Sequence, residues 1–198
     1  MSLFIESIKI FNGRIYNLRR HESRMQRSRV ELISSDVSPI KLRKHIYVPT
    51  DLRQGLVKCR IVYDEDIQAI TYTPHTPKVI RSLKLVYDNS INYHCKYHDR
   101  DHINELYVQK GECDDIIIAK DGMLTDSSYS NIALLQNGKW YTPTTCLLKG
   151  TRREQLIDQG RLVEREISVD DIGKYESVCL INAMMGLGQL RINSSQIV

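Results

Sequence analysis

The sequence has no segment suited to a membrane or to export. No apolar run among its 198 residues approaches the roughly 20 that are needed to cross a bilayer. The first residues, Met1 to Glu6, contain neither a basic leader nor a cleavable apolar stretch. We therefore expect a cytoplasmic protein with no membrane partner.

Cysteine is scarce, and its spacing excludes the usual metal clamps. The five cysteines are Cys59, Cys95, Cys113, Cys146 and Cys179. None forms the Cys-x-x-Cys pair that zinc sites commonly use, and an odd number argues against a disulfide framework. We expect small buried apolar residues at most of these positions, and no bound metal.

Glycine-rich loops for nucleotide phosphates are missing as well. The sequence has neither G-x-G-x-x-G nor a Walker A motif. The motifs that commonly bind nucleotide phosphates are therefore missing. What is present is an ordinary globular composition, with 41% apolar residues, 26% charged residues and a net charge of +4. Such a composition supplies enough apolar surface for a core.

Local signals predict strands and helices without a regular strand–helix–strand repeat. Asn12-Gly13 predicts a tight turn between a strand over 3–11 and a return strand at 14–16. Asn17 is a candidate cap for a helix of about 15 residues. Helices are also expected over 38–46, near 100–110 and after Gly150 and Ser168, and strands over 55–63, 66–73, 83–88, 115–119, 161–167 and 177–181. This mixture predicts an α+β fold.

A proline-rich segment predicts where the chain divides. Pro74-His75-Thr76-Pro77 is the best candidate for a linker. We expect a small N-terminal lobe over residues 1–80 and a larger, mostly sheet lobe over residues 81–198.

Two positions could carry covalent or acid–base chemistry. Lys96 lies in Tyr93-His94-Cys95-Lys96-Tyr97, where desolvation by these neighbours would favour the neutral, nucleophilic amine. The alternative is a surface lysine whose stem covers an aromatic ring. Asp126 lies in a polar cluster, residues 125–131, between apolar strand segments, and buried polar groups need partners. The alternative there is a turn rich in Asx and serine hydrogen bonds.

Two other positions could bind phosphate. Gly150 and Thr151 open a predicted helix, whose N–H groups and dipole could hold an anion, although an ordinary threonine cap explains the same residues. Arg24 follows His21 in an arginine-rich helix and could grip phosphate oxygens bidentately, unless this is simply a solvated charged face. Nucleic-acid binding is disfavoured, because the net charge is small and no RNP-like strand or zinc finger is present.

Together these features make a set. An amine nucleophile, a carboxylate and two phosphate-binding elements are what pyridoxal 5′-phosphate requires of a protein. The amine provides the covalent attachment, and the carboxylate keeps the pyridine nitrogen protonated. The sequence therefore predicts this cofactor.

The same residues belong to a longer series of motifs that runs over nearly the whole chain. The series is Ile5-Glu6-Ser7-Ile8, Asn12-Gly13, Leu18, His21-x-x-Arg24-Met25, Lys96, Thr125-Asp126-Ser127-x-x-Ser130-Asn131, Tyr141-Thr142-Pro143, Gly150-Thr151-Arg152 and Asn182-Ala183-Met184. In order and spacing it resembles the class IV aminotransferases. These are the fold type IV pyridoxal-phosphate enzymes, and they include branched-chain and D-amino-acid aminotransferases and aminodeoxychorismate lyase.

The resemblance implies a role for each candidate residue. Lys96 would be the Schiff-base lysine and the acid/base that moves the substrate proton, and Asp126 would face the pyridine nitrogen. Asn131 and Tyr141-Thr142-Pro143 would shape the fold. The phosphate-binding set implied by the family consists of Arg24, Gly150, Thr151, Asn182 and Ala183.

Departures from the family pattern favour the lyases within it. Asp101 stands where branched-chain aminotransferases have tyrosine. Asp126 is one methylene shorter than the glutamate usual in the family and keeps its charge, so it does not bear on this choice. Arg100, four residues after Lys96, and the Asn182-Ala183 loop look more like the lyases. Arg100 is also a candidate contact for an anionic substrate. The first hypothesis is a lyase that releases pyruvate and 4-aminobenzoate, and the alternative is a branched-chain or D-amino-acid aminotransferase that uses the same Lys96.

The resemblance also implies partners. The substrate would be a small-molecule amine, with no nucleic acid and no membrane involved. A homodimer is expected, with active sites between the two lobes and near the partner subunit.

Overall fold

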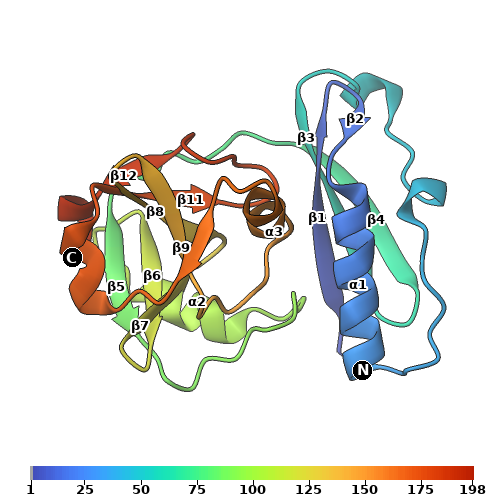
Figure 1. Ribbon diagram of the computed structural model, residues 1–198. Coiled ribbons are helices and arrows are strands. Elements are labelled where there is room, and N and C mark those ends of the chain that lie inside the picture. Colours follow the sequence, from blue (N-terminus) through green and yellow to red (C-terminus); the bar gives the residue numbers. More distant parts are fainter. Residues whose placement is uncertain (1) are drawn as a thin grey trace. The chain divides into compact units, whose positions relative to one another are not determined.

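The computed structural model describes residues 2–198, which form two compact units (Figure 1). Among these residues, unit 1 comprises 2–77 and Cys95–Asp99, and unit 2 comprises Lys78–His94 and Arg100–Val198. The chain leaves unit 1 at the end of the proline-rich segment, close to the predicted division at residue 80. Each unit has its own sheet and core.

The short segment Cys95–Asp99, which carries Lys96, lies with unit 1 although we expected it in the C-terminal lobe. Backbone hydrogen bonds explain its place. Ile5 N–H donates to the carbonyl of Lys96 at 2.9 Å, and His98 N–H donates to the carbonyl of Leu3 at 2.8 Å. The segment therefore runs antiparallel beside the first strand.

Unit 1 is a four-stranded antiparallel sheet with one long helix, in the strand order β2-β1-β3-β4. Its elements are β1 (Phe4–Phe11), β2 (Arg14–Ile15), α1 (Leu18–Leu32), the 3₁₀ turns η1 (Leu42–Lys44) and η2 (Thr50–Leu52), β3 (Leu56–Tyr63) and β4 (Ile67–Pro74). The turn predicted at Asn12-Gly13 is confirmed, with φ of 47° and 73°. These left-handed conformations are the ones that a tight hairpin requires.

The long helix α1 is confirmed in extent, but two predictions around it are wrong. Asn17 has φ of 53° and no side-chain cap bond, so it turns the backbone into the helix without capping it. The helix expected over 38–46 is reduced to η1. Leu42 N–H donates to the Glu22 carboxylate at 2.7 Å, so a tertiary contact with α1 takes the place of a local helical bond.

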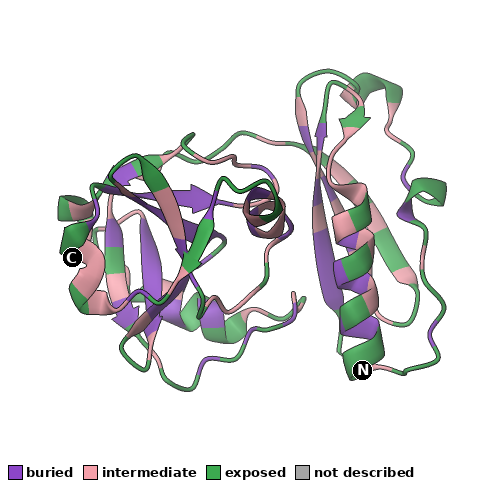
Figure 2. Ribbon diagram, in the orientation of Figure 1, coloured by how far each residue is buried: buried purple, intermediate pink, exposed green. Residues whose placement is uncertain are grey.

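Unit 2 is an eight-stranded mixed sheet with two short helices, in which β5 to β10 are neighbours in order and β11 pairs with β8 and β12. Its elements are β5 (Leu83–Tyr87), α2 (Asp101–Val108), β6 (Asp115–Lys120), β7 (Met123–Ser127), β8 (Asn131–Gln136), β9 (Lys139–Pro143), α3 (Thr151–Asp158), β10 (Val163–Arg165), η3 (Val169–Lys174), β11 (Ser177–Ile181), β12 (Arg191–Asn193) and η4 (Ser194–Gln196). The sheet curls around a buried apolar core (Figure 2). The predicted α+β class is confirmed, and no helix within residues 2–198 is long and apolar enough to span a bilayer.

Candidate functional site

Unit 1 contains a buried ion cluster that joins β1 to α1. Arg24 donates from Nε and Nη2 to the two carboxylate oxygens of Glu6, at 2.8 and 2.6 Å. His21 Nδ1 lies 2.6 Å from Oε2 of the same carboxylate. Glu6 and His21 are fully buried, and Arg24 is 7% exposed. The carboxylate therefore fixes the orientation of the guanidinium.

The strand pattern explains why a carboxylate lies there. Phe4, Ile8 and Ile10 alternate along β1 and are completely buried against α1. Glu6 occupies the same face, because side chains two residues apart lie on one side of a strand. An acid on an apolar face must be paired. Glu6 was not predicted as a site residue, although the alternation of buried side chains along β1 could have indicated it.

The ion cluster keeps Glu6 ionised, while burial lowers the pKa of His21. Burial alone would raise the pKa of Glu6, but the charge of Arg24 and the hydrogen bonds from His21 and Arg24 outweigh it and lower the pKa to about 2. Burial lowers the pKa of His21, opposed by Glu6 and reinforced by the charges of Arg24 and Lys96. Lys96 thus lies within electrostatic reach of the residues around Arg24. The amine and the phosphate-binding arginine predicted from the sequence are both in unit 1.

This cluster predicts that unit 1 loses stability in acid. The unfolded chain protonates Glu6 near its ordinary pKa of 4.5, whereas the folded chain keeps it ionised down to about pH 2. Stability that is present above pH 4.5 should therefore fall between those values, by an amount on the order of 3 kcal/mol. The lowered pKa of His21 has the same sign, with its loss beginning as the pH falls below 6.5. Urea unfolding followed by circular dichroism at several pH values would measure the slope, and a flat profile contradicts the prediction.

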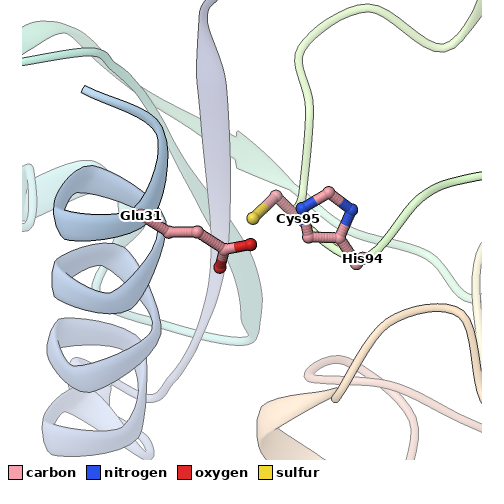
Figure 3. Close-up of side chains that lie close together, drawn as sticks. All are labelled: Glu31, His94 and Cys95. Atoms are coloured by element: carbon pink, nitrogen blue, oxygen red, sulfur yellow. The ribbon is translucent and has the colours of Figure 1, made fainter.

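Cys95 precedes Lys96 and is a thiol of low reactivity. Figure 3 shows Glu31 extending from α1 toward this cysteine. Burial raises the pKa of the Cys95 thiol, and the negative charge of Glu31 raises it further. Because metals and electrophiles take the thiolate, Cys95 is better described as part of the apolar core of unit 1.

Unit 2 contains a second cluster, centred on Asp126 at the end of β7. Its carboxylate accepts a hydrogen bond from Asn131 Nδ2 at 2.7 Å and one from Leu148 N–H at 2.9 Å. Asn131 also donates to the Leu148 carbonyl at 2.7 Å. Asp126 and Asn131 lie directly opposite each other on β7 and β8. Asp126 is only 5% exposed, and serine hydrogen bonds of the kind expected for the alternative are present in the adjoining turn, where Ser130 N–H donates to Ser127 Oγ.

Burial changes the acidity of this carboxylate. It raises the pKa of Asp126 to about 6, against the hydrogen bonds from Leu148 and Asn131 and the positive charge of Arg153. A cation placed beside a carboxylate lowers its pKa again. Asp126 is therefore suited to a partner that carries a proton and a positive charge, as a pyridinium nitrogen does.

The helix α3 begins beside Asn131. Gly150 precedes its first turn, and no side chain caps the helix. Thr151 is 2% exposed. A Cβ on Gly150 would lie 2.0 Å from Asn131 Oδ1, so only glycine allows the backbone to approach this closely. Anion binding at this helix N-terminus stays a prediction from the sequence.

We expect Gly150→Ala to disturb the Asp126 cluster. Asn131 cannot retreat without losing its bonds to Asp126 and to the Leu148 carbonyl, so the substitution should destabilise unit 2 by about 1–3 kcal/mol. Gly173→Ala is a matched control, because nothing lies within 4 Å of its Cβ position and its φ is not positive. Urea unfolding followed by Trp140 fluorescence would compare them, and equal midpoints contradict the prediction.

The loop after β11 is held by the side chain of Asn182. Its Oδ1 accepts from the amides of Met184 and Met185 at 2.8 and 3.0 Å, and its Nδ2 donates to Ser130 Oγ at 2.9 Å. The Asn182 amide itself donates to the Met185 carbonyl at 3.1 Å. That amide was expected to bind phosphate, but it is engaged within the turn, so Asn182 shapes the loop that presents Ala183.

Arg100 is held inside unit 2. Its Nη2 donates to the carbonyl of Ser128 at 2.6 Å and its Nη1 to Tyr93 Oη at 3.3 Å. The guanidinium also lies 4.2 Å from the centre of the Tyr129 ring. All of these contacts lie within the protein, whereas an anionic substrate was the partner considered for Arg100 from the sequence.

The arginine-rich helix is only partly a charged surface. Arg29 is 3% exposed and donates to the carbonyls of Glu65 and Ser38. Arg24 is bound to Glu6. Arg24 and Arg29 of this helix therefore support the fold of unit 1. Fewer of its arginines remain to bind nucleic acid.

Each unit, taken by itself, carries groups of the kinds that pyridoxal 5′-phosphate uses. Unit 1 offers an amine and an arginine oriented by Glu6. Unit 2 offers a buried carboxylate fixed by two hydrogen bonds. It also offers a helix N-terminus whose N-cap position, Gly150, has no room for a Cβ beside Asn131. Arginine and helix termini suit phosphate, and a carboxylate suits a pyridine N–H.

Comparison with known proteins identifies a pyridoxal-phosphate-dependent enzyme of fold type IV. The chain belongs to the family Amino-transferase class IV, which matches residues 3–192. An uncharacterized protein of Haemophilus influenzae is 41% identical over 92% of this chain and 97% of its own length. The crystal structure of a "putative 4-amino-4-deoxychorismate lyase" from Haemophilus somnus 129PT has a TM-score of 0.89 at 38% identity and covers 94% of this chain and 98% of that one. A "putative aminodeoxychorismate lyase" of Schizosaccharomyces pombe is 29% identical over 41% of this chain and 38% of its own.

Proposed function

We propose that this chain binds pyridoxal 5′-phosphate and acts as an aminodeoxychorismate lyase, releasing pyruvate and 4-aminobenzoate. The observation that carries the proposal is the Asp126 carboxylate, buried and fixed by Asn131 and Leu148 as a pyridine partner requires. A relative of known structure, named a "putative 4-amino-4-deoxychorismate lyase", shares 38% identity and covers 94% of this chain. Arg100 and the Asn182-Ala183 loop also resemble the lyases.

Each residue has a defined task in this proposal. When bound, the cofactor supplies an electron sink for the pair left on carbon after a proton is removed. Lys96 would hold the cofactor covalently, and its amine, once free, would take the proton from the carbon beside the substrate nitrogen. Asp126 would pair with the protonated ring nitrogen and stabilise its charge.

The proposal assigns phosphate binding to Arg24, Gly150, Thr151 and Ala183. In unit 1, Arg24 presents a guanidinium whose direction is set by Glu6. In unit 2, Gly150, Thr151 and Ala183 offer backbone N–H groups, and Thr151 a hydroxyl. Such contacts hold the cofactor without taking part in proton transfer.

The proposed elimination needs no oxidant, because the bonding pair leaves with the enolpyruvyl group. Loss of the proton from the ring carbon drives cleavage of the ether bond to the enolpyruvyl group, which leaves with the bonding pair and takes up a proton to become pyruvate. The remaining ring becomes aromatic as 4-aminobenzoate. Aromatisation makes the elimination favourable.

Incubation of the protein and cofactor with aminodeoxychorismate tests this proposal. We expect pyruvate and 4-aminobenzoate in equal amounts. A parallel incubation with branched-chain or D-amino acids and 2-oxoglutarate tests the alternative within the family, which is an aminotransferase that uses the same Lys96. Glutamate from the second reaction and no pyruvate from the first would reject the lyase and favour the aminotransferase.

We also propose a homodimer, since small enzymes commonly assemble with two-fold symmetry. Sedimentation equilibrium measures the mass directly. A mass near twice that of the 23.0 kDa chain supports the proposal, and a monomer at all concentrations contradicts it.

A further inference from the structure

A tight turn separates the two residues that form the Asp126 cluster. Asp126 and Asn131 are an opposed pair on β7 and β8, and the turn between them is closed by Ser127 N–H, which donates to the Ser130 carbonyl at 2.8 Å. Ser130 N–H donates back to Ser127 Oγ at 3.1 Å. The shape of this turn therefore sets the position of the carboxylate relative to the amide that holds it.

Ser128, inside the turn, is held at both of its polar ends. Arg100 Nη2 donates to its carbonyl at 2.6 Å, and its hydroxyl donates to the buried Asp115 carboxylate at 2.5 Å. Ser128 is 2% exposed and Asp115 is 5% exposed. Hydrogen bonds to charged groups are the stronger kind, so these contacts restrain the turn more than its own backbone does.

Aromatic rings fix the arginine in turn. The Arg100 guanidinium lies 4.2 Å from the centre of the Tyr129 ring and 5.7 Å from that of Tyr93. Tyr93 Oη accepts from Nη1 at 3.3 Å. Arg100 Nε is buried and has no hydrogen-bond partner among residues 2–198. Stacking on the tyrosine rings and hydrogen bonds from the two terminal nitrogens hold the Arg100 side chain at the turn.

We propose that Arg100 is a positioning residue that locks the 127–130 turn, and through it Asp126 and Asn131, rather than a contact for an anionic substrate. The part of this inference that concerns the cofactor rests on the proposed function. The part that concerns the turn does not, because every contact involved lies within the protein.

The first experiment measures the turn without cofactor. Amide hydrogen exchange is compared between the wild type and Arg100→Met, with Arg165→Met as a matched control. Arg165 also lies over a tyrosine, 3.5 Å from the centre of the Tyr141 ring, but it is outside the turn. We expect the 127–130 amides to exchange at least about tenfold faster in Arg100→Met, with the other strands unchanged. Unchanged exchange in the turn would overturn the inference.

The second experiment measures the cofactor and the substrate. Arg100→Met should weaken pyridoxal-phosphate binding by about tenfold or more, and the pH at which the bound chromophore changes should shift, because Asp126 no longer lies in place. Arg100→Lys keeps the charge but lacks the fork, and should restore little of the affinity. Normal cofactor affinity with a raised KM would show a substrate contact and overturn the proposal.

Failure of the wild type to bind cofactor and failure of Arg100→Met to fold have different consequences. If the wild type never binds the cofactor, the proposed function fails, while faster exchange in Arg100→Met still supports the role in the turn. If Arg100→Met does not fold, Tyr129→Leu takes its place, because Tyr129 is 60% exposed and its loss removes only the stacking. Exchange in the turn should then rise by a smaller factor, and no rise overturns the proposal.

Discussion

Lys96→Ala should abolish the borohydride-reducible chromophore and lower turnover at least about 10⁴-fold. Lys96 is assigned both the covalent attachment and the proton transfer, and the loss of a nucleophile or a general base removes that much rate in other enzymes. Absorbance before and after reduction, followed by peptide mapping of the reduced adduct, measures the first effect. A coupled assay for pyruvate measures the second.

The fold should survive this substitution. The two hydrogen bonds that hold the segment beside the N-terminal strand are made by backbone groups, and the Lys96 carbonyl that accepts from Ile5 N–H remains in alanine. Lys58→Ala is a suitable control, because Lys58 also lies in unit 1, on β3. A chromophore that persists in Lys96→Ala and maps to another lysine would refute the assignment, whereas its loss in both variants would point to a general effect of lysine removal.

Features set by neighbouring residues could be predicted from the sequence. The hairpin turn at Asn12-Gly13 was found because the turn itself requires residues that accept positive φ. The short helix after Ser168 was found through its capping box, which the structure contains. In the candidate site, Asp126 was found because a carboxylate between apolar strands needs a partner.

Features set by distant residues could not be predicted in the same way. The helix expected over 38–46 failed because Glu22, far away in the sequence, binds Leu42 N–H. Asn131 was assigned only to the fold, since its bonds to Asp126 and Leu148 exist only once β7, β8 and the following loop have come together. Periodicity describes a single element, whereas these contacts depend on how several elements meet.

The two polar clusters serve the proposed chemistry by opposite electrostatic means. In unit 1, paired charges overcome burial and keep Glu6 ionised. In unit 2, burial prevails and raises the pKa of Asp126 to about 6. The first cluster can therefore support the fold before any ligand arrives, while the second gains most when a positive charge is placed beside it.

Glu6→Gln should destabilise unit 1 and weaken cofactor binding together. The substitution keeps the shape of the side chain but leaves the buried Arg24 guanidinium without its carboxylate, and breaking a buried pair in this way costs about 3–5 kcal/mol. It also frees Arg24 from the two bonds that set its direction, so its contact with phosphate should weaken. Urea unfolding followed by circular dichroism, and titration with pyridoxal phosphate, measure the two effects.

Controls separate this effect from a general loss of charge. Glu65→Gln removes an exposed carboxylate from the same unit and should change stability by less than about 0.5 kcal/mol. In Glu6→Gln the loss of stability between pH 4.5 and about 2 should also become smaller, because Glu6 no longer titrates there. If Glu6→Gln unfolds at the wild-type urea concentration and keeps the same acid slope, the Glu6–Arg24 pair neither stabilises unit 1 nor orients the arginine for phosphate.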